Sequence, residues 1–180
     1  MSSPNIAEKT FKTNNFNYLY DLIHSESKEI ALDSDIILSE EEESQFLEGI
    51  KLDKDNLHID GNGHFIDAKN STRIFYCSGK NITIENIRLK NGFAQENGGA
   101  IYIEKGEIRI MKSAITENTA KYGGSIYNHM GSLDIIESSL NENTAKYGGS
   151  IYNDEGIVII KESSLIGNLA KSNGRGNAQL

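Results

Sequence analysis

Two acidic residues stand at positions where a catalytic pair could form. Asp60 and Glu85 lie 25 residues apart, and His58 and Arg88 lie near them in the sequence. Two carboxyl groups that converge on one strand face can act as acid and base in polysaccharide cleavage, or can bind calcium. A polysaccharide lyase or hydrolase centred on Asp60 and Glu85 is therefore one hypothesis. We favour the alternative that these are ordinary charges on a solvated strand face.

A column of aromatic residues offers a binding surface instead of a reaction centre. Its members recur about once every 25 residues and are Phe75, Tyr102, Tyr127 and Tyr152. If they face outward, they can stack on sugar rings or pack against a partner. If they face inward, they belong to the core and the neighbouring isoleucines face outward. Both positions are apolar, so both orientations stay open, and we favour a structural role for these tyrosines.

Two further tyrosines are better candidates for exposure. Tyr122 and Tyr147 lie at predicted turns, directly after Lys121 and Lys146. An aromatic ring beside an ammonium group is suited to contact with a glycan or a protein surface. We therefore take Tyr122 and Tyr147 as the first binding candidates.

The remaining motifs favour structural interpretations. The segment DGNGH at 60–64 fails as a calcium loop, because a histidine and a phenylalanine stand where a ligand and a glycine are needed. It also lacks the third glycine and the helix of a phosphate loop, so a tight turn is predicted. The four histidines show no metal-ligand spacing. Cys77 has no histidine partner and is predicted to be a buried hydrophobe, and we predict no metal and no cofactor.

The twelve residues ENTAKYGGSIYN occur twice, at 117–128 and at 142–153. An active site is used once, whereas a repeated string is typical of a structural unit that is stacked. Apolar alternation continues with this period back to about residue 55. One column contains Leu57, Ile82, Ile108, Leu133 and Val158, with steps of 25, 26, 25 and 25 residues. The adjacent outward columns contain His58, Thr83, Arg109, Asp134 and Ile159, and Asp60, Glu85, Met111, Ile136 and Lys161.

Each unit contains three short β-branched segments separated by Gly, Asn and Ser turns, the pattern of a coil that stacks on its neighbours. We predict an all-β fold: a parallel β-helix of about five 25-residue coils, each with three short strands. Asn118, Asn143 and Asn168 recur at one turn, where stacked asparagines bond one another. A leucine-rich repeat has a similar period, but the GGSIYN half lacks its helical or leucine-spaced return.

The first third of the chain follows a different pattern. We expect a flexible N-terminus at 1–13, an N-terminal cap at 14–54, the β-helix repeats at 55–172 and a tail at 173–180. Within the cap, the pattern predicts an amphipathic helix at 14–26, a strand at 28–38, a short helix at 39–49 and a strand at 50–53. Ser39 and Glu42 are spaced as a capping box for the short helix.

The two ends of the β-helix have different prospects. The amphipathic helix at 14–26 would cover the unpaired strands of the first coil. The tail has lost the apolar residues of the repeat. We therefore expect the last coil to be covered by a partner, by self-association through its open edge, or by further coils of a longer parent protein.

Composition excludes several function classes. The formal net charge of −8 argues against nucleic-acid binding, which requires a basic surface. No apolar run is long enough to span a membrane, and the N-terminal residues lack the apolar stretch of a secretory signal. A single cysteine excludes an intramolecular disulfide.

The repeats resemble a known family. GGAI (98–101) and GGSI (123–126 and 148–151) are similar to one element of the polymorphic outer membrane protein repeat. The second element of that repeat, F-x-x-N, has lost its phenylalanine here and reads I-x-x-N or L-x-x-N. DNLHIDGNGHFIDAKNSTRIF, followed by GKNITIENIRLKNG, resembles the first coils of archaeal adhesin-like, pectate-lyase-like β-helix proteins. Across about 15–172, the resemblance implies a right-handed parallel β-helix with an adhesive role at the cell surface.

Together, these observations favour a non-catalytic, adhesin-like module that contacts a glycan or a cell-surface protein. The carbohydrate-active enzyme and a piece of a longer β-helix protein are the alternatives. The compartment stays open, because the family implies the cell surface while the chain shows no export signal.

Overall fold

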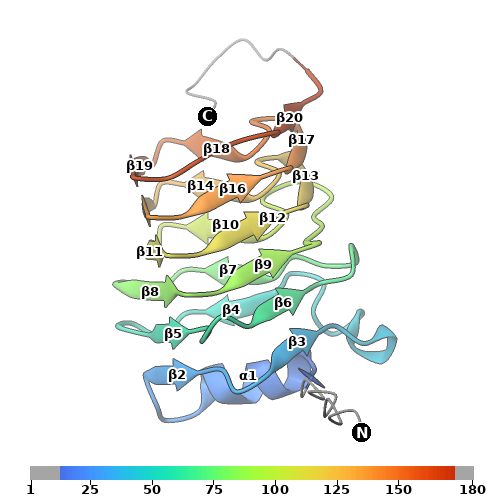
Figure 1. Ribbon diagram of the computed structural model, residues 1–180, viewed down its shortest axis with the longest axis vertical. Coiled ribbons are helices and arrows are strands. Elements are labelled where there is room, and N and C mark those ends of the chain that lie inside the picture. Colours follow the sequence, from blue (N-terminus) through green and yellow to red (C-terminus); the bar gives the residue numbers. More distant parts are fainter. Residues whose placement is uncertain (1–12, 173–180) are drawn as a thin grey trace, which may run out of the picture.

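Three large parallel β-sheets and a small fourth one wrap around an apolar interior and form a β-solenoid of about six coils (Figure 1). The computed structural model describes residues 13–172. Sheet 1 contains β2 (Glu29–Ala31), β5 (His58–Asp60), β8 (Ile82–Glu85), β11 (Glu107–Met111), β15 (Ser132–Ile136) and β19 (Ile157–Lys161). Sheet 2 contains β1 (Thr13–Asn14), β3 (Asp35–Ile37), β6 (Phe65–Asp67), β9 (Arg88–Lys90), β12 (Ala114–Thr116) and β16 (Ser139–Asn141).

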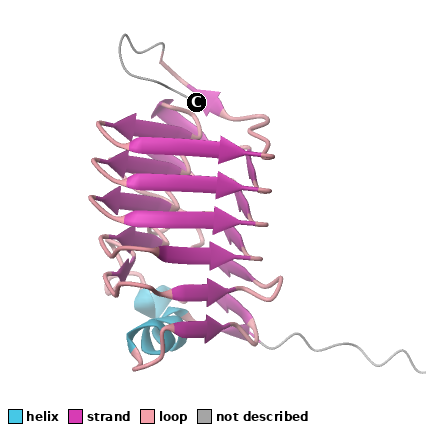
Figure 2. Cartoon of the chain, turned by 90° about the vertical axis from the view of Figure 1, so that its left-hand side faces the viewer, coloured by secondary structure: helices cyan, strands magenta, loops and turns pink. Residues whose placement is uncertain are grey.

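Two further sheets complete the coils. Sheet 3 contains β4 (Ile50–Leu52), β7 (Phe75–Cys77), β10 (Ile101–Glu104), β14 (Ile126–His129) and β18 (Ile151–Asp154). The small sheet 4 contains β13 (Thr119–Tyr122), β17 (Thr144–Tyr147) and β20 (Leu169–Ala170). Figure 2 shows the resulting stack of parallel strands, with helix at one end only. The predicted all-β parallel fold is confirmed.

The solenoid begins one coil earlier than the sequence predicts. Strands β2, β3 and β4, which were expected in the cap, pair in parallel with β5, β6 and β7 of the next coil. The predicted strand at 28–38 is two strands, because the chain turns a corner between Ala31 and Asp35. The count of five coils is therefore corrected to six. The N-terminal residues 1–12 and the tail at 173–180 lie outside the described residues.

The helix α1 (Phe16–His24) covers the first coil. The Asn15 side chain caps it by accepting a hydrogen bond from the Tyr18 backbone N–H at 3.1 Å. Phe16, Leu19 and Ile23 are buried against the coil. This helix therefore covers the unpaired strand ends that the first coil would expose.

The predicted second helix is a single 3-10 turn, η1 (Glu40–Glu42). Ser39 and Glu42 form the predicted capping box, in which Glu42 accepts a bond of 3.0 Å from the Ser39 backbone N–H. The Ser39 hydroxyl donates a further bond to the same carboxylate. Glu42 also accepts a bond of 2.7 Å from the Asn17 backbone N–H on α1. Burial opposes the charged form of Glu42, but these hydrogen bonds outweigh it and lower its pKa. The buried carboxylate thus connects the helix to the first coil.

The repeated glycine pair has a separate physical reason at each position. Gly123 has a φ of +62°, a left-handed conformation that glycine adopts without strain. A Cβ added to Gly124 would lie 2.3 Å from the carbonyl oxygen of Gly149 in the next coil. One glycine makes the turn and the other permits the close approach of successive coils.

The asparagine ladder (Asn118, Asn143 and Asn168) is confirmed inside the solenoid. Asn118 and Asn143 are fully buried. The Oδ1 atom of Asn143 accepts bonds from the backbone N–H and the Nδ2 of Asn118, at 3.1 and 2.9 Å. Asn168 accepts the same two bonds from Asn143, both at 3.0 Å. Each asparagine side chain thus provides the hydrogen-bond acceptor for the turn of the preceding coil.

Candidate functional site: the tyrosine face

The tyrosines of sheet 3 point outward, and the isoleucines beside them form the core. Ile101, Ile126 and Ile151 are buried to 1% exposure or less, whereas the tyrosine that follows each of them is half-buried. Successive side chains of a strand point to opposite faces, so the burial of the isoleucines means that the tyrosines point outward. The structural role that we favoured for these tyrosines as part of the core is therefore wrong.

The aromatic column also starts one residue later than predicted. Phe75 pairs with Ile101 and is fully buried, and Tyr76 pairs with Tyr102. Phe75 thus belongs to the isoleucine column, and Tyr76 replaces it in the outward column. The step between these two coils is 26 residues, and a shift of one residue moves a side chain to the opposite face.

The outward rings of sheet 3 contact one another along the solenoid. The ring centroids of Tyr76 and Tyr102 are 5.3 Å apart with an interplanar angle of 82°, and those of Tyr102 and Tyr127 are 5.3 Å apart at 76°. Tyr127 and Tyr152 are stacked at 5.5 Å and 6°. Parallel strand pairing sets this spacing, so the ladder is a direct consequence of the repeat.

The second pair of tyrosines extends the same surface onto sheet 4. The rings of Tyr122 and Tyr147 stack at 5.1 Å and 17°, with Lys121 and Lys146 over their faces at 5.3 and 5.2 Å. Tyr122 also meets Tyr152 edge-on at 5.2 Å. Six side chains thus form one surface, which we call the tyrosine face: Tyr76, Tyr102, Tyr122, Tyr127, Tyr147 and Tyr152.

Polar groups hold parts of this face in place. Asp154 accepts hydrogen bonds from the Tyr127 hydroxyl at 2.9 Å and from Nδ1 of His129 at 2.7 Å. These two bonds lower the pKa of Asp154. Burial, together with the bond to Asp154, raises the pKa of Tyr127. Tyr76 donates its hydroxyl to Glu104 in the same way.

A groove of about 450 Å³ borders the face beside Tyr102. The Arg73 side chain, 6% exposed, lies at its base, with its guanidinium carbon 5.3 Å from the Tyr102 ring. Arg73 donates to the carbonyls of Glu48, Asn97 and Gly98 at 2.7 to 3.2 Å. It thus fixes the loop that forms the groove wall. The sequence prediction missed Arg73, although a charged residue two positions before a buried strand is an available signal.

The structure brings together part of the predicted acidic group. Asp60 and Glu85 pair as neighbours in sheet 1, as the columns predict. His58 lies between Glu29 and Glu85, with nitrogen–oxygen distances of 2.6 and 2.8 Å. The bond to Glu29 is the largest influence that raises the pKa of His58. Both imidazole nitrogens are therefore occupied by carboxylates of adjacent coils.

Arg88 does not join this group. It lies on β9 of sheet 2, where its guanidinium carbon is 5.8 Å from the Phe65 ring. Among residues 13–172, no three His, Cys, Asp or Glu side chains converge as metal ligands. The carboxylate pair thus has a hydrogen-bonded histidine beside it, and the predicted arginine lies on another sheet.

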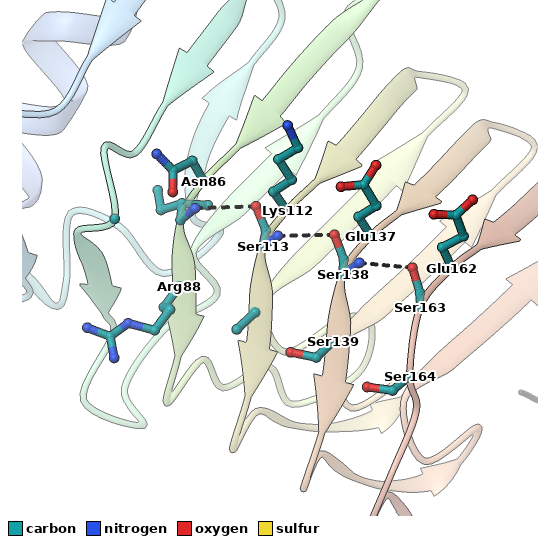
Figure 3. Close-up of a pocket in the computed structure, with 13 residues that line it drawn as sticks. Asn86, Arg88, Lys112, Ser113, Glu137, Ser138, Ser139, Glu162, Ser163 and Ser164 are labelled. Carbon is teal, nitrogen blue, oxygen red and sulfur yellow. Dashed lines mark hydrogen bonds between the residues drawn. The ribbon is translucent and has the colours of Figure 1, made fainter.

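A trough of about 740 Å³ runs along the corner where successive coils enter sheet 2 (Figure 3). Three serines of successive coils line it, and each accepts a hydrogen bond from a backbone N–H of the coil before it: Ser113, Ser138 and Ser163. The hydroxyls of all three also donate to backbone carbonyls. These serines stabilise the corners of the coils. Lys112, Glu137 and Glu162 also line the trough, so it presents charges of both signs (Figure 3).

The other motifs have the predicted structural roles. The segment at 60–64 is a tight turn, in which the His64 N–H donates to the Gly61 carbonyl at 2.8 Å and both central residues have positive φ. Cys77 is fully buried, and burial raises the pKa of its thiol to about 12. A thiol with this pKa is unreactive at neutral pH.

Comparisons of the chain with protein-family models, with curated proteins and with solved structures found no match. Among the described residues, no helix has the length and apolar character to cross a membrane. The parallel β-helix implied by the resemblance is the fold observed, and membership of a particular family stays a prediction.

Proposed function

We propose that the chain is a non-catalytic, adhesin-like binding module whose tyrosine face binds a glycan. The observation that carries this proposal is the outward orientation of six tyrosine rings across two adjoining sheets. Half-exposed aromatic rings with polar hydroxyl ends suit sugar rings, which present both apolar faces and hydroxyl groups.

The charges around the face favour a neutral ligand. Lys121 pairs with Glu96 at 2.7 Å, His129 with Asp154 at 2.7 Å, and Arg73 with Glu48 at 3.1 Å. These ion pairs compensate opposite charges along much of the surface, which favours a neutral ligand over an ion. A hydroxyl-rich neutral glycan meets both the rings and these dipolar pairs.

A glycan array followed by calorimetry of the bound glycans tests the proposal. The variant that combines Tyr122→Ala and Tyr147→Ala removes one stacked pair with its cation contacts. We expect affinity to fall by roughly tenfold or more, because an aromatic contact contributes about 0.5–1.5 kcal/mol. Phe65→Ala is the matched control, since it removes an outward ring from sheet 2 and should leave affinity unchanged.

Two results would contradict this proposal. Equal glycan affinity of the double variant and the unmodified chain would show that binding occurs elsewhere. Absence of glycan binding, combined with tyrosine-dependent capture of a cell-surface protein, would replace the glycan by a protein ligand.

A further inference from the structure

The last strand of sheet 1 differs in composition from the strands it continues. The two preceding strands read EIRIM and SLDII, with polar residues among the outward positions, whereas β19 reads IVIIK. Its outward residues Ile157 and Ile159 are 63% and 42% exposed. A strand with apolar residues on both faces is typical of a position that is covered on both sides.

Within residues 13–172, the outer edge of β19 is also unpaired. It is the last strand of its sheet, at the end of the solenoid opposite α1 (Figure 1). The Ile157 N–H donates to Gly131, and the Lys161 carbonyl accepts from Glu137, both in the preceding coil. Alternate residues of a strand direct their backbone groups to opposite sides, so Val158 and Ile160 present N–H and C=O groups at the open edge.

The other end of the molecule is capped, which disfavours it as the partner for this edge. The helix α1 and the buried side chains Phe16, Leu19 and Ile23 cover the first coil. Head-to-tail stacking of copies would require this helix to leave its site. Two open ends, by contrast, can meet around a two-fold axis, which makes a closed and self-complementary interface.

We propose that β19 pairs in an antiparallel manner with β19 of a second copy, with Ile159 on the two-fold axis. In this register, inward residues of one copy lie opposite inward residues of the other, and outward residues opposite outward ones. A shift by one residue would place inward residues opposite outward ones. Val158 of each copy then lies opposite Ile160 of the other, and each such pair exchanges two N–H···O bonds. Ile159 faces its own counterpart in the close, non-hydrogen-bonded position. This pairing gives hydrogen-bond partners to the open backbone groups and an apolar contact to the outward Ile159.

The first test is solution mass by light scattering over a range of concentrations. We expect the unmodified chain to pass from monomer to dimer as concentration rises. Ile159→Lys places like charges opposite each other and should weaken the dimer by at least about tenfold. Thr83→Lys is the matched control, because Thr83 occupies the same outward column in an internal coil and should leave the dimer intact. A monomer at every concentration would overturn the proposal.

The second test locates the contact by crosslinking. Opposite residues in the close position have Cα atoms about 4.5 Å apart, within the range that a disulfide spans. Ile159→Cys should therefore give a covalent dimer under a mild oxidant, and Thr83→Cys should not. The native Cys77 is buried and does not interfere. Equal crosslinking of both variants, or none with Ile159→Cys, would show that copies do not meet through β19.

Discussion

The asparagine ladder and the tyrosine face repeat with the same coil spacing, yet they differ in what their side chains leave free. Asn143 makes four side-chain hydrogen bonds within the solenoid and is fully buried. Tyr147 contacts another ring and a lysine but stays half-exposed. Repetition alone therefore does not identify a functional surface. Burial and saturated hydrogen bonds indicate a stabilising ladder, and exposed rings indicate a surface that can bind.

The largest effect is expected from breaking the inner ladder. Asn143→Leu removes the acceptor of the Asn118 backbone N–H and leaves the Ile115 carbonyl without its donor. Unsatisfied buried groups cost about 1–3 kcal/mol each, so we expect the free energy of unfolding to fall by about 3 kcal/mol. Urea denaturation measures it. Asn141→Leu, at an outward position of β16, is the control. It removes only an exposed bond of 2.9 Å from the Ile166 N–H and should cost less than about 1 kcal/mol. Equal losses of stability in the two variants would show that the asparagine ladder is not a special stabilising element.

A smaller effect is expected on the tyrosine face. Tyr127→Phe removes the hydroxyl bond to Asp154 but keeps the ring contacts. This bond is half-exposed, so the free energy of unfolding should fall by at most about 1 kcal/mol. Thermal denaturation of this variant is compared with that of Tyr147→Phe, which loses no hydrogen bond found within residues 13–172. The difference between the two variants gives the contribution of the Tyr127–Asp154 bond. A loss as large as that of Asn143→Leu would make this face a stabilising element.

The outward contact of His58 should make stability depend on pH. Its pKa is raised above the ordinary value of 6.5 by Glu29, against the effect of burial, and with help from Glu85. The protonated form is favoured in the folded state, so this stabilisation is fully present below about pH 6.5 and is lost as pH rises through the raised value. We expect urea midpoints of the unmodified chain and His58→Gln to differ at pH 5.5 and to converge at pH 9. A constant difference across this range would contradict the assignment.

The smallest effect is expected at Asp60. Its carboxylate accepts a bond of 2.8 Å from the Asn62 N–H in the exposed turn, so Asp60→Ala should change the free energy of unfolding by less than about 1 kcal/mol. Glycan binding by the tyrosine face should be unchanged. Calcium-dependent cleavage of an acidic polysaccharide by the unmodified chain, abolished in Asp60→Ala, would instead support the enzyme hypothesis.

Much of the fold could be predicted because the spacing of like residues shows which residues pair between successive coils. The outward columns that contain Asp60 and Glu85, and Arg109 and Asp134, pair as predicted. The first coil was missed because residues 28–54 contain no Asn and only one Gly, Gly49, and so lack the repeated turn pattern of the later units. Only strand pairing reveals that β2, β3 and β4 belong to the solenoid.

The tyrosine face was predicted in part. Five of its six residues were candidates, and the sixth, Tyr76, was missed because Phe75 is the better chemical match to Tyr102. The 26-residue step already visible between Ile82 and Ile108 applies to the third strand as well, and following it would have paired Tyr76 with Tyr102. Residue similarity was a weaker guide to register than the coil length that a neighbouring column gives.

The sequence by itself determined the repeat, the parallel stacking and the asparagine ladder, since each follows from like residues at a fixed spacing. Only the tertiary structure decided which of two adjacent apolar columns faces solvent. Isoleucine and tyrosine both fit a strand, and the choice depends on the volume that three sheets enclose between them. The same enclosure buries the isoleucines, places the larger rings outside and creates the surface to which we assign binding.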